Sequence, residues 1–131
     1  MADQLLPALI AIESAISAAA PELTRVYSSV NDDAVHPYAL ITIGDHEGAY
    51  FQDTDIKVTV LSKPGGEEPL PVEVIKITRK VRAALEDQVL TTTAGSVVMR
   101  WRSSRPARLG DDNATWLSSS DFVATTTEEV S

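Results

Sequence analysis

The chain has 131 residues, of which 44% are hydrophobic and 23% charged, and a formal net charge of −8 at pH 7. This length is typical of one domain, and the acidic balance disfavours general binding to nucleic acid or an anionic membrane, because the average field repels phosphate. The absence of cysteine excludes disulfides and thiolate metal sites. We expect a single domain over residues 1–131, with flexible ends at 1–4 and 126–131.

The first 23 residues, MADQLLPALIAIESAISAAAPEL, predict an amphipathic helix that ends near Pro21. Asp3 is a candidate N-cap. A signal peptide or a membrane span is disfavoured, because no basic segment precedes the apolar residues and Glu13 interrupts them. The apolar stripe that we expect to face the core contains Leu5, Leu9, Ile12 and Ile16, widened by Leu6 and Ile10.

The next two predicted elements are strands. Residues 38–45, YALITIGD, are rich in aromatic and β-branched side chains, and residues 54–63 alternate between apolar and polar. Residues 46–53 are expected to connect them, so that the pair forms an antiparallel hairpin.

Residues 72–89 return to a helical period, with a buried stripe and a surface pair Arg82–Glu86 at i,i+4 spacing. The members of the stripe are Val74, Ile77, Val81, Ala84 and Leu85.

A second hairpin completes the chain. In residues 96–104 the alternation places Val97, Met99 and Trp101 on one face and Val98, Arg100 and Arg102 on the other. Residues 105–114 are typical of a loop, and residues 116–125 are predicted to form the last strand. That strand offers the core either Trp116, Phe122 and Ala124 or Leu117 and Val123. The order α-β-β-α-β-β predicts an α+β domain of two layers, an antiparallel sheet covered by helices.

No catalytic, cofactor or metal site can be assembled from these residues. His46 lies between two carboxylates in GDHEG, but adjacent side chains of an extended chain point to opposite sides, and a solvated turn is favoured. The NDD and GDDN segments lack the spacing of a calcium loop and are typical of turns. No nucleophile, base and orienting group occur together. We therefore expect no enzyme activity, no cofactor and no metal.

Positive charge is concentrated in one stretch, VVMRWRSSRPARLGDDNATW. Arg100, Arg102, Arg105 and Arg108 fall within nine residues, in a chain with 11 basic and 19 acidic residues. Because Asp111 and Asp112 follow at once, we interpret the stretch as a charged hairpin with its own counter-ions that docks against protein. Aromatic residues are enriched at interface centres, so Trp116 is either core or interface. The acidic turn that contains Asp45 and Glu47 is expected to supply an opposing face. An alternative is a nucleic-acid-binding module that uses the four arginines.

The ordered set of segments resembles the tail-completion proteins, also called tail terminators or head–tail joining proteins, of long-tailed bacteriophages and gene transfer agents. The resemblance covers about Leu5 to Ala124 and rests on the leading amphipathic helix and on four segments that follow it. They are the strand HPYALITIGD, the strand DIKVTVLSK, the helix VEVIKITRKVRAAL and the final hairpin VVMRWRSSRPARLGDDNATW.

This resemblance implies a structural virion protein without catalysis or cofactor. Members of the family form a ring, commonly of six subunits, on the head-proximal end of the tail tube. The ring stops addition of tube protein and presents a surface to the head–tail connector, while genome DNA passes through its bore. The implied partners are other copies of the chain, the tube protein and the connector, with assembly in the host cytoplasm and no membrane. A neighbouring adaptor or stopper of the same neck is the alternative within this class.

Overall fold

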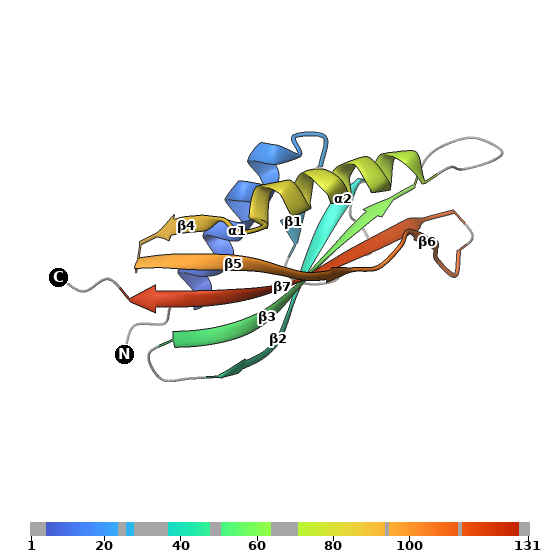
Figure 1. Ribbon diagram of the computed structural model, residues 1–131. Coiled ribbons are helices and arrows are strands. Elements are labelled where there is room, and N and C mark those ends of the chain that lie inside the picture. Colours follow the sequence, from blue (N-terminus) through green and yellow to red (C-terminus); the bar gives the residue numbers. More distant parts are fainter. Residues whose placement is uncertain are drawn as a thin grey trace.

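The computed structural model describes residues 5–23, 26–27, 37–47, 51–63, 71–93, 95–112 and 114–128. They form two helices and one seven-stranded sheet (Figure 1). The helices are α1 (Leu5–Ala19) and α2 (Val72–Leu85). The strands are β1 (Val26–Tyr27), β2 (Tyr38–Glu47), β3 (Phe51–Ser62), β4 (Val89–Thr92), β5 (Gly95–Ser104), β6 (Arg108–Leu109) and β7 (Trp116–Glu128).

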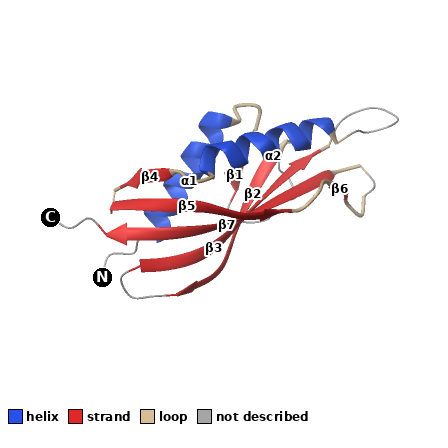
Figure 2. Cartoon of the chain, in the orientation of Figure 1, coloured by secondary structure: helices blue, strands red, loops and turns tan. Residues whose placement is uncertain are grey.

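The sheet has the strand order β1-β2-β3-β7-β5-β4, and β6 pairs with β7 away from this path. All pairings are antiparallel except that of β1 with β2, which is parallel. Both helices lie on one side of the sheet (Figure 2), and their buried side chains join one face of it in a single apolar cluster. The other face of the sheet has no helix over it among the described residues. The α+β class is therefore confirmed.

Alternation decides which face of each strand enters the core. In β7 the side chains of Phe122 and Ala124 are buried, whereas Leu117 and Val123 lie on the uncovered face and are half-buried. Of the two faces of β7 that the sequence offered to the core, the one with Phe122 and Ala124 is therefore the buried face. In β5 the prediction is confirmed, since Val97 and Met99 are fully buried and the arginines lie on the uncovered face.

The helices largely follow their predicted stripes. In α2 the buried side chains are Val74, Ile77, Val81 and Leu85, and Ala84 is half-buried. The helix ends at Leu85 rather than Val89, because Glu86 is extended and Asp87 adopts a φ of 56°, which turns the chain into β4. In α1, Ala8, Ile12 and Ile16 are buried, but Ile10 is 56% exposed and does not widen the core stripe. Pro21 ends α1 as expected, and Asp3 lies outside the described residues.

The predicted order of elements is wrong in three places, where short strands β1, β4 and β6 were not foreseen. Two to four residues carry too little periodicity to be distinguished from turns. The hairpin of β2 and β3 is also longer than expected, so that His46 lies in a strand rather than a turn. Strand β7 continues to Glu128, into the segment expected to be a flexible end. Residues 1–4 and 129–131 lie outside the described part.

Candidate functional site

Arg100 and Arg102 project from β5 on the uncovered face of the sheet, and both are exposed. Arg102 lies where the register of β5 and β7 shifts between Trp101 and Ser103. Its Nη1 donates to Oδ1 of Asp55 in β3 at 2.9 Å, so the side chain crosses over β7. The sequence did not predict Asp55 as a counter-ion, because it lies 47 residues away.

Arg105 and Arg108 lie beyond the end of β5, with Arg108 in β6. The backbone N–H of Arg105 donates to the carbonyl of Ser119 at 2.8 Å, and Arg108 in β6 pairs with Leu117. Both side chains are exposed, and neither forms an ion pair with another described side chain. The prediction that Asp111 and Asp112 serve as counter-ions of these arginines is therefore wrong within the described part of the chain.

Asp112 instead stabilises its own turn. Its Oδ1 accepts hydrogen bonds from the backbone N–H groups of Ala114 at 3.0 Å and Thr115 at 2.8 Å, and its Oδ2 accepts one from the Thr115 hydroxyl. These bonds, that of the hydroxyl first, lower the pKa of Asp112 to about 2. The carboxylate oxygens are thus used locally to set the return from β6 to β7.

The depressed pKa of Asp112 predicts a pH-dependent contribution to stability. A carboxyl with a lowered folded pKa stabilises the fold above its unfolded pKa of 3.8 and loses that contribution as pH falls toward 2. We expect Asp112→Asn to melt below wild type at pH 7, with the gap in melting temperature closing between pH 4 and pH 2. Thermal melts of both proteins across this range check it. A gap that stays constant would contradict the assignment.

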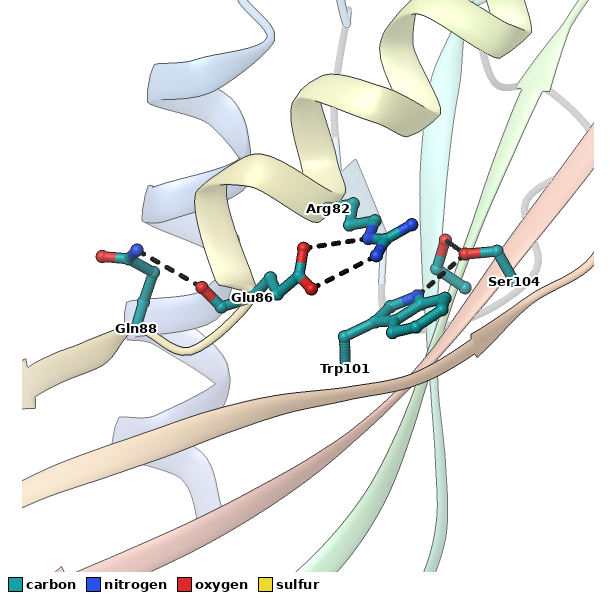
Figure 3. Close-up of polar contacts among 6 residues, drawn as sticks. Arg82, Glu86, Gln88, Trp101 and Ser104 are labelled. Atoms are coloured by element: carbon teal, nitrogen blue, oxygen red, sulfur yellow. Dashed lines mark hydrogen bonds and ion pairs between the residues drawn. The ribbon is translucent and has the colours of Figure 1, made fainter.

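Arg82 on α2 and Trp101 on β5 form a cluster that joins helix to sheet (Figure 3). The Arg82 guanidinium lies 3.6 Å from the centroid of the indole ring, a cation–π contact. Its Nε and Nη2 donate to the two carboxylate oxygens of Glu86 at 2.9 and 3.2 Å, which confirms the predicted i,i+4 pair. The indole Nε1–H donates to Ser104 Oγ at 2.9 Å, and Ser104 Oγ lies 3.0 Å from that of Ser120. The guanidinium is therefore held by two partners, the indole ring of Trp101 and the carboxylate of Glu86.

A groove runs beside this cluster, between α2 and the segment that follows β5. We call it the arginine groove. It has a volume of about 280 Å³, and three of its lining residues are arginines, Arg79 and Arg82 on α2 and Arg105 after β5. The remaining lining residues are Ile75, Thr78, Ser104, Pro106, Ala107 and Ser118. The sequence does not reveal this groove, because the pattern of Arg79 and Arg82 is typical of solvated charges on the outer face of a helix.

The residues predicted for the acidic face lie on β2. Asp45 and Glu47 belong to β2 rather than to a turn, and Glu47 is the direct register partner of Asp53 in β3. The side chains of these three residues lie outside the described part.

Trp116, the remaining residue predicted for an interface, is half-buried against the core. Among the described residues, no three His, Cys, Asp or Glu side chains are placed to hold a metal ion. Within that same part of the chain, neither helix is long and apolar enough to cross a membrane.

No protein-family model matches the sequence, and no curated protein matches it either. Solved structures do match the fold. One is a chain of the structure described as the virion of a native gene transfer agent (GTA) particle, with a TM-score of 0.65 at 16% sequence identity. The match covers 95% of this chain and 98% of that one. The two chains therefore share a fold over nearly their whole lengths.

Proposed function

We propose that the chain is a structural virion protein, a ring-forming tail terminator that caps the head-proximal end of a tail tube and joins it to the head–tail connector. The observation that carries this proposal is the fold shared end to end with a chain of a gene transfer agent virion. The four segments that resemble tail-completion proteins lie on β2, on β3, on α2 and on the stretch from β5 to the start of β7, all within this shared fold.

The distribution of charge supports assembly with further copies. A ring requires a head-to-tail interface, in which one surface of each subunit complements a different surface of the next. Residues 26–56 carry six acidic side chains and no Lys or Arg, whereas 76–108 carry eight basic and two acidic ones. A chain whose acidic and basic residues are separated in this way favours one orientation of a neighbouring copy.

The proposal also assigns a role to the formal net charge of −8. A bore of low positive charge lets genome DNA pass, because few phosphates are neutralised and the DNA is not retained. No catalysis or cofactor enters this role. The protein would assemble in the host cytoplasm and remain in the neck of the particle, in contact with tube protein and connector.

Arrest of tube growth tests this function. Tail tubes of the same particle are grown from their tube protein with and without the purified chain, and their lengths are measured by electron microscopy. We expect tubes capped early to stay short while uncapped tubes lengthen, since the ring blocks the growing end. Growth that is unaffected at saturating concentration would contradict the proposal. Binding to the connector alone would assign the chain as a neck adaptor or stopper.

A further inference from the structure

Strand β4 is the last strand on one side of the sheet, and no further strand lies beyond it among the described residues (Figure 1). Its four residues, Val89–Thr92, include no charged residue and no proline, and they pair with β5 without a shift in register. Natural proteins usually protect an exposed edge with charge, proline or a bulge, because its unpaired N–H and C=O groups can bind another strand. Strand β4 has none of these protections.

The opposite edge of the sheet is protected. There β1 covers part of β2, and the register of β2 against β3 shifts between Ile43 and His46. Strand β2 also contains the charged residues Asp45 and Glu47. The two edges therefore differ in kind, and β4 is the edge that is open to pairing with a further strand.

Apolar side chains are exposed on both sides of the β4 edge. Val89, the register partner of Val98, is 64% exposed on the uncovered face of the sheet, and Ile10 of α1 is 56% exposed on the helix side. A hollow of about 290 Å³ lies between α1 and β4, lined by Ile10 with three other residues of α1 and by residues 90–93. None of these lining residues is charged. A strand added beside β4 would cover both exposed side chains, and this burial favours its binding.

The backbone of β4 determines how a second strand can pair with it. The carbonyl of Gln88 accepts a hydrogen bond from the N–H of Met99 in β5 at 2.8 Å, so residue 88 directs its backbone groups toward β5. In an antiparallel ladder the backbone groups of successive residues point to alternate sides. Leu90 therefore also bonds to β5, whereas Val89 and Thr91 direct their N–H and C=O groups outward. These are the groups that a second strand would meet.

We propose that β4 pairs with β4 of a second copy, antiparallel and across a two-fold axis perpendicular to the sheet, so that the two sheets become continuous. Leu90 then lies opposite Leu90 of the second copy. Val89 of each copy lies opposite Thr91 of the other, and each such pair exchanges both of its backbone hydrogen bonds. Of the registers that keep the faces of the two sheets aligned, this one pairs all the outward-pointing residues of β4.

The absence of charge at this edge favours a second copy as the occupant. A two-fold contact brings identical surfaces together, so any charge on them would face its own kind. The chain has a formal net charge of −8, but β4 and the lining of the hollow are uncharged, and identical copies can meet there without repulsion between facing residues. Both α1 helices then lie on the same side of the joined sheet, with Ile10 of each near the paired Leu90 residues.

This contact goes beyond the proposed function. A two-fold contact joins two copies and cannot by itself close a ring, which requires a head-to-tail interface. The contact therefore adds a pairing of copies to the proposed ring and does not supply the ring's own interface.

Reciprocal charge substitution tests the contact and its register. One variant carries Val89→Lys with Thr91→Lys, and the other carries Val89→Glu with Thr91→Glu; both residues are exposed in the single copy. We expect each variant alone to self-associate at least about tenfold more weakly than wild type, because like charges then face each other in both pairs. An equimolar mixture should restore association, since every lysine then faces a glutamate. The matched control is Ser17→Lys with Val72→Lys, two exposed residues outside β4 and the hollow.

Association is measured by sedimentation velocity and native mass spectrometry over a series of concentrations. A mixture that associates no better than either variant alone would overturn the contact. So would a wild-type protein that remains monomeric up to about 1 mM. Recovery of association in the mixture also shows that both variants are folded.

A proline substitution separates backbone pairing from contact between side chains. Thr91→Pro removes an outward-pointing N–H, a change that an edge strand tolerates. We expect it to weaken self-association at least about tenfold, because each two-fold contact then lacks two of its backbone donors. Thr91→Val keeps the N–H and the branched side chain, so it should associate as wild type does. Equal association of the two variants would contradict strand pairing.

Single cysteines map the register, since the chain has no cysteine of its own. In the proposed pairing the two Leu90 Cα atoms lie about 4.5 Å apart, within the range for a disulfide. The two Val89 residues lie diagonally, beyond that range. We expect Leu90→Cys to form a cross-linked dimer in a glutathione redox buffer faster than Val89→Cys, although Val89 is the more exposed residue. Faster linkage through position 89 would overturn the register.

The arrest of tube growth distinguishes failure of this contact from failure of the proposed function. Copies that pair through β4 and yet leave tube growth unaffected would leave the contact standing and remove the terminator role. Suppose instead that the free protein is monomeric and that Thr91→Pro abolishes binding to tail tubes. Then β4 receives a strand of the tube protein, and the contact between copies is wrong.

Discussion

Replacing Phe122 by alanine is expected to lower the free energy of unfolding by about 3–5 kcal/mol. Phe122 is fully buried in the central strand β7, which pairs with both β3 and β5. Its removal leaves a cavity beneath the helices that the paired strands cannot close. Because domains of this size are stable by about 5–15 kcal/mol, the variant should unfold at a markedly lower urea concentration, as measured by circular dichroism.

Val123 offers the matched control for this change. It is the next residue of β7 and lies half-buried on the uncovered face. Val123→Ala should cost less than about 1 kcal/mol, because neighbouring side chains and water can fill the space. Equal effects at positions 122 and 123 would contradict the assigned facing of β7.

Replacing Trp101 by alanine should lower the free energy of unfolding by about 2–3 kcal/mol. The half-buried indole packs against the core, supports the Arg82 guanidinium at 3.6 Å and donates to Ser104. Truncation of a fully buried Trp costs about 3–5 kcal/mol, and partial exposure reduces that value. By contrast, the double variant Arg79→Glu with Arg105→Glu should have a free energy of unfolding within about 1 kcal/mol of the wild-type value, as is usual for surface substitutions.

A double-mutant cycle separates the cation–π contact from simple loss of packing. Trp101→Ala, Arg82→Ala and the double variant should give a coupling free energy of about 0.5–2 kcal/mol. Arg79→Ala serves as the control for Arg82→Ala, since it lies one turn earlier on α2 and has no such ring contact among the described residues. A coupling near zero would mean that Arg82 is held by Glu86 alone.

Much of the fold was predictable where periodicity extends over a whole element. The buried stripe of α2 and the split of β5 into an apolar and an arginine-bearing face follow directly from helical and strand periods. The short strands β1, β4 and β6 depend on tertiary pairing and not on local pattern. The facing of β7 was ambiguous because both of its faces carry apolar residues, and burial by the helices decided it.

The functional site was only half predictable. The cluster of arginines near the end of β5 is evident in the sequence, but its partners are not. Asp55 reaches Arg102 across a whole strand, while Asp112 turns inward to its own backbone. Arg79 and Arg82 join Arg105 only because α2 packs over β5 and β7. Such convergence depends on the registers of strands and on helix packing, which no local pattern contains.

The most direct test of the central claim is electron cryo-microscopy of tail tubes mixed with the purified chain. The account predicts rings of uniform size at one end of each tube. Protein scattered along the tube walls, or absent from tube ends at saturating concentration, would contradict it.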